Sequence, residues 1–393
     1  VAWAPSEIPD ERYRIVPKEM PREMIYEIIE AYSEAALRLQ KAGCDGVEVL
    51  AGMGYLVAQF MNPSTNQRKD EFGGSFENRL RFLSEILIKT RAKVGGEFVI
   101  GIRVSGDELD GLGLDANDML KICKTIDDKQ LVDYFNVIAS SSATPFGWIR
   151  VFPPMEIKPL YAAPFAKEIR KNVSKPVILG GRINQPQEAE KMISEGVADF
   201  CAMVRPFIAD PEFAIKAESG NSEHIRACVA CNQACVGHRL AHFPVSCIQY
   251  PESGREQIYG ELELVKKSQK VMIVGGGPAG MKAAIVAANR GHSVEIFEKS
   301  AQLGGQVLLA QQLPGREEFG GVATNLAHEL QATTAITHLN QEVTAQTITE
   351  FAADVVIIAT GSVARKANLD LDEKTDIVYA HDIIENNKKT ANS

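Results

Sequence analysis

The sequence lacks the features of a membrane protein and of a nucleic-acid-binding protein. No apolar stretch approaches the roughly 20 residues of a spanning helix, and the N-terminus has no charged segment followed by an apolar one. There is no dense basic run and the formal net charge is -9, which argues against binding a phosphate backbone. We therefore predict a cytoplasmic protein that works without nucleic acid or membrane.

Length and composition are those of an ordinary globular protein. The chain has 393 residues, of which 45% are hydrophobic and 24% charged, enough for two or three domains. It begins with Val1 in place of Met, so we expect either a processed protein or a fragment.

Four of the seven cysteines fall in one short segment, with the spacing Cys228-x2-Cys231-x3-Cys235, then eleven residues, then Cys247. In a reducing compartment such close thiols are more often metal ligands than disulfide partners. Structural zinc sites usually use two Cys-x-x-Cys pairs or added histidines, whereas three clustered cysteines and a distant fourth favour an iron-sulfur cube. Zinc and unliganded cysteines remain the alternatives.

The other cysteines and the nearby histidines have simpler interpretations. His238 and His242 lie between the proposed ligands and are expected to be solvated loop residues. Cys44, Cys123 and Cys201 lie in helical or strand patterns and are expected to be buried.

The first half of the sequence alternates strand and helix patterns, which predicts parallel strands joined by crossover helices. Strands are expected at residues 45–50, 98–104, 133–139, 175–181 and 198–204. Helices are expected at residues 24–39, 75–94, 116–128, 161–172 and 186–195, and residues 1–22 are expected to be irregular. Five strands are fewer than the eight of a closed (β/α)8 barrel. We therefore predict an N-terminally incomplete TIM barrel, with three units missing.

Charged and glycine residues follow the predicted strands, where barrel enzymes place their chemistry. Gly180, Gly181 and Arg182 end one strand and Arg205 follows the next, a pattern typical of a phosphate site. Ordinary turns with solvated arginines are the alternative. Arg103 ends an earlier strand and would place a cation in the barrel mouth, where it could stabilise a reduced flavin.

A dinucleotide-binding pattern occupies the last third of the chain. A β-branched strand leads into Gly275-x-Gly277-x-x-Gly280, a helix follows, and a second strand ends at Glu298, eighteen residues after the last glycine. The glycines let a pyrophosphate approach the helix N-terminus, and the acid accepts hydrogen bonds from ribose hydroxyls.

Several long stretches carry a family resemblance: "GYLVAQFMNPSTNQRKDEFGGSFENRLRF", "PVILGGRINQPQEAE", "VRPFIADP" and the four-cysteine segment. They resemble the flavin oxidoreductases related to Old Yellow Enzyme, in the large iron-sulfur branch that contains 2,4-dienoyl-CoA reductase and trimethylamine dehydrogenase. The resemblance implies an FMN-bearing barrel, a 4Fe-4S cluster on the four cysteines, and FAD or ADP in a Rossmann-like C-terminal part. It also implies that the first barrel strands precede this chain.

The resemblance implies domains at 1–218 (partial FMN barrel), 219–268 (4Fe-4S segment and connector) and 269–393 (partial FAD/NAD(P)-binding domain). The implied FMN contacts are Arg103, Gly181, Arg182, Met203 and Arg205. The implied contacts of the second nucleotide are Gly275, Gly277, Ala279, Gly280, Glu298, Lys299, Gly305, Gln306 and Ala359.

The barrel mouth decides between the reactions of this branch. Tyr55 matches a tyrosine that relatives use as a proton donor or near a substrate amine, and with Arg103 it forms the predicted catalytic pair. Met53 stands where relatives carry Glu or His, and "IASSSATPFGW" lacks the histidine of dienoyl reductases. An aromatic wall for a substituted ammonium, with core or loop packing as the alternative, would use Phe146, Trp148 and Phe152.

We therefore predict an enzyme that oxidises a small N-methylated amine, with electrons passing from FMN through the cluster to the second nucleotide or to an external acceptor such as an electron-transfer flavoprotein. The alternatives are an NAD(P)H-dependent enoate or 2,4-dienoyl-CoA-type reductase and a non-catalytic electron-transfer module. The incomplete barrel predicts weak flavin retention and poor solubility.

Overall fold

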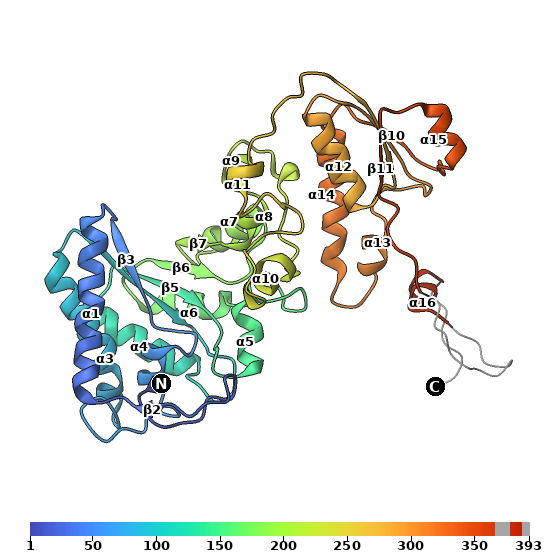
Figure 1. Cartoon of the computed structure of the whole chain (residues 1–393). Coiled ribbons are helices and arrows are strands. Elements are labelled where there is room, and N and C mark those ends of the chain that lie inside the picture. The colour runs from blue at the N-terminus through green and yellow to red at the C-terminus, as the bar shows by residue number, and fades with distance from the viewer. Residues whose placement is uncertain (366–377, 387–393) are drawn as a thin grey trace, which may run out of the picture. The chain divides into compact units, whose positions relative to one another are not determined.

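The computed structural model describes residues 1–365 and 378–386. Its chain forms two compact units, Val1–Val204 and Arg205–Ser393, which are described separately (Figure 1). No helix in the described part of the chain is long and apolar enough to cross a membrane.

The first unit is built on five parallel strands in sequential order. They are β3 (Gly46–Leu50), β4 (Val99–Ser105), β5 (Tyr134–Ile138), β6 (Val177–Gly180) and β7 (Phe200–Ala202). Each strand pairs with the next one in the chain, which is the winding of a barrel wall. The five predicted strands are confirmed.

One helix, α1 (Arg22–Lys41), precedes β3, and the other helices lie between successive strands. The latter are α2 (Leu56–Met61), α3 (Phe76–Val94), α4 (Ala116–Asp128), α5 (Pro145–Val151), α6 (Ala163–Asn172) and α7 (Pro186–Ser194). The five predicted helices are confirmed, and side-chain caps explain two of the starts: Ser75 accepts from the Asn78 amide and Asp115 from the Asn117 and Asp118 amides.

Three features of the first unit were not predicted. The short helices α2 and α5 follow directly after β3 and β5. Within residues 1–22, β1 (Trp3–Ala4) and β2 (Lys18–Glu19) form a small parallel pair, so this segment is not wholly irregular.

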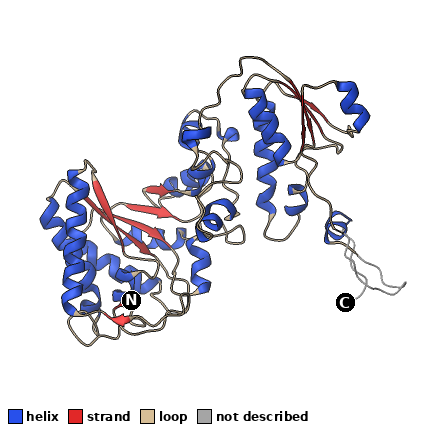
Figure 2. Ribbon diagram, in the orientation of Figure 1, coloured by secondary structure: helices blue, strands red, loops and turns tan. Residues whose placement is uncertain are grey.

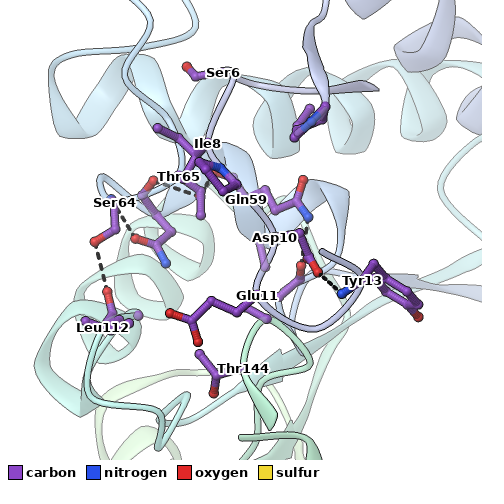
Figure 3. Close-up of a pocket in the computed structure, with 18 of the residues that line it drawn as sticks. Ser6, Ile8, Asp10, Glu11, Tyr13, Gln59, Ser64, Thr65, Leu112 and Thr144 are labelled. Carbon is purple, nitrogen blue, oxygen red and sulfur yellow. Dashed lines mark hydrogen bonds between the residues drawn. The ribbon is translucent and has the colours of Figure 1, made fainter. Parts of the chain in front are cut away.

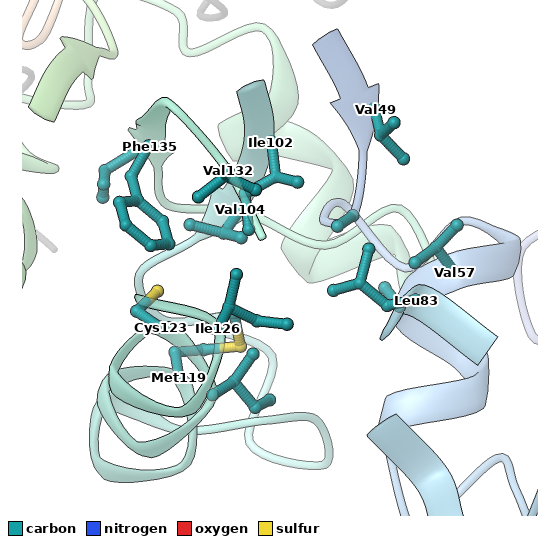
Figure 4. Close-up of a cluster of buried hydrophobic side chains, with 14 of the residues drawn as sticks. Val49, Val57, Leu83, Ile102, Val104, Met119, Cys123, Ile126, Val132 and Phe135 are labelled. Carbon is teal, nitrogen blue, oxygen red and sulfur yellow. The ribbon is translucent and has the colours of Figure 1, made fainter. Parts of the chain in front are cut away.

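The core of this unit lies between the strands and the helices that cover them. Figure 4 shows Ile102 and Phe135 of the sheet facing Met119 and Cys123 of α4, and all four side chains are buried. Burial raises the pKa of Cys123 to about 12, so this thiol stays neutral. The prediction for Cys44 was wrong: it is exposed, because it lies in the loop between α1 and β3.

The second unit begins with short helices around the cysteine segment. They are α8 (Arg205–Ala209), α9 (Phe213–Glu218), the 3-10 turn η1 (Ser222–His224), the π-helical turn η2 (Gln233–Gly237), α10 (His238–Leu240) and α11 (Glu256–Tyr259).

A parallel four-stranded sheet follows, in the order β10-β9-β8-β11. Its strands are among those drawn in red in Figure 2. Its strands are β8 (Lys270–Val274), β9 (Ser293–Phe297), β10 (Ile336–His338) and β11 (Val355–Ile358). The remaining elements are α12 (Pro278–Asn289), α13 (Val307–Ala310), η3 (Glu317–Phe319), α14 (Gly320–Gln331), α15 (Ala345–Phe351) and α16 (Ala380–Asn386). In chain order this is the 3-2-1-4 arrangement of the Rossmann fold, so the predicted dinucleotide fold is confirmed.

Candidate functional site

The four clustered cysteines come together in space. Cys228, Cys231, Cys235 and Cys247 line one small cavity in the second unit. All four side chains are partly buried, and burial raises the pKa of Cys231 to about 11. The backbone is left-handed at Ala230 (φ 50°) and Asn232 (φ 56°), on either side of Cys231, so the loop bends sharply around the cavity.

The four thiols line one cavity without converging on a single point. Around zinc, Zn–S bonds of about 2.3 Å would bring the sulfurs to within roughly 4 Å of each other. No three metal-ligating side chains of the described residues converge on such a point. An iron-sulfur cube instead binds each thiolate at a different corner, so its four sulfurs stand farther apart around one larger body.

Hydrogen bonds tie the cysteine loop to its surroundings within the second unit. Arg205 donates from Nη1 to Oδ1 of Asn232 over 2.8 Å. The backbone amide of Gln249 donates to Sγ of Cys247 at 3.4 Å. The side chain of Gln249 donates from Nε2 to the Ala227 carbonyl at 2.7 Å. Asn325 of α14 donates to Oε1 of Gln249 at 2.8 Å, which joins the loop to the nucleotide-binding fold.

Neither predicted loop histidine is among the described residues that line this cavity. His242 is exposed, and Nδ1 of His238 lies 3.1 Å from the Pro244 carbonyl oxygen. The interpretation as a solvated loop residue holds for His242, but not for His238, which is the first residue of α10 and is partly buried.

The three fingerprint glycines have different surroundings. A Cβ on Gly275 would lie 2.4 Å from the Ala359 oxygen, and one on Gly280 would lie 1.9 Å from the Gly275 oxygen. These two positions allow close packing of strand, helix and loop. A Cβ on Gly277 would meet nothing nearer than Gly305 Cα at 4.0 Å, so open space lies in front of the start of α12. That space fits a pyrophosphate.

Glu298 lies directly after β9, beside the fingerprint. Its Oε2 accepts from the Gly276 amide at 2.7 Å, and its Oε1 accepts from the amide and hydroxyl of Ser300 at 2.8 Å each. Burial favours the neutral acid, but these donors outweigh it and lower the pKa of Glu298. The group is therefore a carboxylate that can also accept from ribose hydroxyls.

The remaining predicted nucleotide contacts lie around the same loop. The Gly304 amide donates to the Gly276 carbonyl at 2.9 Å, which places Gly305 beside Gly277, and Gln306 donates from Nε2 to the Ser362 carbonyl. The Ala359 amide donates to the carbonyl of Val274 at 2.8 Å. Val274 is the residue directly before the fingerprint glycines. Ala279 and Lys299 are exposed at the first turn of α12 and after β9.

In the first unit, Arg103 is paired within the sheet. Its Nε lies 2.8 Å from Oε1 of Glu48 on the neighbouring strand β3. Oε2 of Glu48 accepts from Asn136 at 2.8 Å and from the Tyr134 hydroxyl at 3.3 Å. Arg103, the cation predicted for the barrel mouth, is therefore paired with the carboxylate of Glu48, and the sequence did not reveal this partner.

The predicted phosphate residues divide between the two units. Gly181 (φ 132°) and Arg182 (φ 50°) follow β6, and Arg182 is only 5% exposed. Arg182 donates from Nη1 to the Ile157 carbonyl, so it is not the solvated arginine of the alternative interpretation. Met203 follows β7 and packs against the core, whereas Arg205 lines the cysteine cavity.

Tyr55 and Met53 occupy the loop after β3. Tyr55 is the N-cap residue of α2 and is 38% exposed. Met53 has a left-handed backbone (φ 61°), and its carbonyl accepts from the amide and hydroxyl of Ser142 at 2.8 and 2.7 Å. The backbone amide of Met53 donates to Ser105 Oγ at 2.9 Å. The ends of β3, β4 and β5 are thus tied together by serine hydroxyls.

The predicted aromatic wall has another role. Trp148 packs edge-on against Phe152 with ring centroids 5.3 Å apart, and the guanidinium of Arg12 covers its face. Phe146 is 59% exposed and is covered by Arg150. The cations on these rings are the protein's own side chains, which agrees with the packing alternative.

Sequence reasoning missed a cavity of about 410 Å³ at the carboxyl ends of β3, β4 and β5. Figure 3 shows the segment from Ser6 to Tyr13 over the cavity, with Gln59, Ser64 and Thr65 on another wall. Glu108, which follows β4, also lines it and is 2% exposed. The signal for this residue was an acid between two aspartates directly after a strand, in "GDELDG".

Comparisons with known families match both units. The model of the NADH:flavin oxidoreductase / NADH oxidase family matches residues 3–224. The model of the pyridine nucleotide-disulphide oxidoreductases matches residues 269–392.

Individual proteins match over almost the whole chain. An NADH oxidase of Thermoanaerobacter brockii is 38% identical over 91% of this chain and 55% of its own length. An N,N-dimethylglycine/sarcosine dehydrogenase of Chromohalobacter salexigens is 36% identical, over 91% and 52%. The structure of a 2-naphthoyl-CoA reductase complex superimposes with a TM-score of 0.92 at 33% identity, over 99% and 58%. The chain thus spans little more than half the length of these relatives.

Proposed function

This chain belongs to the NADH:flavin oxidoreductase / NADH oxidase family, and from that premise we propose that it is a flavin- and 4Fe-4S-dependent enzyme that oxidises a small N-methylated amine. The observation that carries the cofactor part is the convergence of Cys228, Cys231, Cys235 and Cys247 on one cavity, in the same unit as a 3-2-1-4 nucleotide-binding sheet. When bound, FMN would supply a hydride acceptor, the cluster a one-electron relay, and FAD or ADP the second nucleotide.

The chain's own residues would hold these groups. The four thiols would bind the irons, with Arg205 adding a positive charge beside Cys228. The open face of Gly277 would admit a pyrophosphate, and Glu298 would accept from ribose hydroxyls.

The FMN contacts proposed for Gly181, Arg182, Met203 and Arg205 rest on the family. Arg103 is the cation proposed to face the flavin. Its pairing with Glu48 would fix the orientation of the guanidinium.

Two observations favour amine oxidation. One relative is named an N,N-dimethylglycine/sarcosine dehydrogenase. In addition, residues 140–142, where dienoyl reductases would carry a histidine, are serines tied into backbone hydrogen bonds, including Ser142 Oγ to the Met53 carbonyl. They offer no group that titrates near neutral pH, whereas Tyr55 is exposed and free to act as a hydrogen-bond donor to a substrate amine.

The second candidate function is reduction of an activated carbon-carbon double bond with NAD(P)H. The similarity to a 2-naphthoyl-CoA reductase supports it. A non-catalytic electron-transfer module is the third. The division into domains 1–218, 219–268 and 269–393, the cytoplasmic location and an electron-transfer flavoprotein as acceptor belong to the same proposal.

Anaerobic stopped-flow measurement of flavin bleaching tests the reaction. Methylated amines should reduce the flavin of the loaded protein without NAD(P)H, whereas a dienoyl-CoA should not reoxidise flavin that NADPH has reduced. The reverse result would establish the reductase. Iron and labile sulfide should disappear in Cys231→Ala and persist in Cys44→Ser, because Cys44 is an exposed residue between α1 and β3 and does not line the cysteine cavity.

A further inference from the structure

A buried arginine joins the two ends of the cysteine segment. Arg226 lies two residues before Cys228, the first of the four cysteines. Tyr250 lies three residues after Cys247, the last of them. The guanidinium carbon of Arg226 stands 4.5 Å from the centre of the Tyr250 ring, and only 13% of the Arg226 side chain is exposed. The second unit therefore holds a positive charge in its interior, beside the segment that carries all four thiols.

Hydrogen bonds fix this guanidinium in place. Its Nε donates to the Ala209 carbonyl at 3.0 Å, and its Nη1 donates to Oε1 of Glu329 on α14 at 2.9 Å. Its Nη2 lies 3.8 Å from Oδ1 of Asp210. A guanidinium that is held by several partners and stacked on an aromatic ring keeps one orientation, and it stays charged at every pH at which the protein is folded.

The two carboxylates beside Arg226 have different surroundings. Asp210 is fully buried, and Lys216 donates from Nζ to its Oδ2 at 2.7 Å. The backbone amide of Arg226 donates to the same oxygen at 2.9 Å, so much of the charge of Asp210 is already balanced. Glu329 makes the shorter contact with the guanidinium. Glu329 is therefore the carboxylate that balances Arg226 most directly.

The charge of Arg226 reaches the last of the four thiols. Burial raises the pKa of Cys247, whereas the backbone amides of Gln249 and Tyr250 and the charge of Arg226 lower it. A fixed cation that favours a thiolate favours any further negative charge at the same place. Each electron that enters a thiolate-bound cluster adds one negative charge, and the net charge around a cluster is one of the factors that set its reduction potential.

We propose that Arg226 is a positioning residue that raises the reduction potential of the iron-sulfur cluster, by holding one positive charge beside the Cys247 end of the segment. The inference rests on the proposed 4Fe-4S cluster and extends it. In the step concerned, reduced flavin gives up one electron and the cluster takes it up, while Arg226 binds no iron and transfers no proton. The ion pair with Glu329 links this charge to α14 of the nucleotide-binding fold.

A redox titration of the cluster-loaded protein tests the charge. Dithionite is the reductant, and the EPR signal of the reduced cluster is the readout. At a fixed applied potential, Arg226→Gln should lower the ratio of reduced to oxidised cluster at least about tenfold, which corresponds to about 59 mV for one electron.

Arg290→Gln is the matched control for this titration. It removes the same charge at the exposed end of α12 and should change the ratio less than about twofold, because water and salt screen that position. Equal shifts in Arg226→Gln and Arg290→Gln would overturn the proposal, and so would an unchanged potential in Arg226→Gln.

Glu329→Gln separates the effect of charge from that of loop geometry. It removes the carboxylate that balances Arg226, while the glutamine oxygen can still accept the hydrogen bond from Nη1. The potential should therefore move in the opposite direction, with the ratio of reduced to oxidised cluster rising about twofold or more. This variant keeps Arg226 in place, so it decides the matter even if Arg226→Gln does not fold. An unchanged or lower potential in Glu329→Gln would contradict the proposal.

Arg226→Lys separates the charge from the planar shape. Lysine keeps the positive charge but offers one nitrogen in place of the guanidinium fork. The ratio of reduced to oxidised cluster should stay within about threefold of the parent's, whereas a chelator should remove iron faster, because the two ends of the segment are held less firmly. A potential as low as that of Arg226→Gln would show that the shape of the side chain acts and not its charge, which would overturn the proposal.

The two proposals fail in distinguishable ways. If the parent protein, purified without oxygen, contains neither iron nor labile sulfide, the proposed cluster falls and the role of Arg226 falls with it. If iron and sulfide are present and the parent and all variants share one potential, the cluster stands and only the role of Arg226 falls.

Discussion

The guanidinium carbon of Arg12 lies 3.2 Å from the centre of the Trp148 ring. Arg12 belongs to the N-terminal segment that covers the cavity, and Trp148 belongs to α5, which follows β5. This contact joins two segments that are more than a hundred residues apart, and it uses the ring face that a substrate ammonium would otherwise occupy.

Replacement of Arg12 should loosen the N-terminal segment. We expect Arg12→Gln to lower the free energy of unfolding by about 1 kcal/mol, the usual strength of a partly shielded cation-π contact, and to change the emission of Trp148. Denaturant unfolding followed by tryptophan fluorescence measures both. Arg150→Gln is the control, because Arg150 covers the exposed Phe146. If Arg150→Gln lowered the free energy of unfolding more than Arg12→Gln does, the contact between Arg12 and Trp148 would not be the stabilising one.

Glu108 should make stability depend on pH. The pKa of Glu108 is about 7 in the folded protein against an ordinary value of 4.5, so the folded state holds a proton that the unfolded state releases between these values. This contribution is fully present below about pH 4.5 and is lost as the pH rises through about 7. Glu108→Gln should therefore match the parent at about pH 4.5 and exceed its stability by up to about 3 kcal/mol at about pH 8. Denaturant unfolding at both pH values tests this, with Glu11→Gln as the exposed control. Parallel pH profiles of Glu108→Gln and the parent would contradict it.

The fingerprint glycines should respond differently to alanine. At Gly277, φ is -74° and an added Cβ meets no atom closer than 4.0 Å, so Gly277→Ala should melt like the parent. It should nevertheless bind ADP at least about tenfold more weakly, because the methyl group fills the space proposed for the pyrophosphate. Calorimetry with ADP and a thermal melt give the two values.

Gly280→Ala should instead destabilise the fold by about 2 kcal/mol or more, because its Cβ would lie 1.9 Å from the Gly275 oxygen. Gly96→Ala, with nothing within 4 Å, is the control. If Gly277→Ala bound ADP as tightly as the parent, the pyrophosphate would not bind in front of Gly277.

Gln249 should hold the cysteine loop on the nucleotide-binding fold. It is 3% exposed and bridges the Ala227 carbonyl and the Asn325 amide group. Gln249→Leu leaves both partners unpaired, which should cost about 2 to 4 kcal/mol and lower the iron and sulfide content of purified protein. The control is Gln233→Leu, at an exposed position of the same loop. Iron analysis and unfolding curves provide the readouts, and equal iron retention in both variants would exclude this role.

Local patterns were enough to predict the strands and long helices, the glycine fingerprint with Glu298, and the four cysteines as one group. Hydrophobic periodicity extends over many residues in α1, α3 and α4, and ligand spacing is a property of one short segment. The helices α2 and α5 have only 6 and 7 residues, too few for a period to emerge, and were missed.

Only the tertiary structure could reveal the partners of side chains that lie far apart in the chain. Glu48 beside Arg103 and Arg12 on Trp148 require strands and loops to meet in space. The same holds for Glu108: its raised pKa comes from burial under segments distant in sequence, and desolvation depends on every atom that excludes water from the site. Residue type and spacing thus determined which groups this chain carries, and packing decided which of them are already paired and which face a cavity.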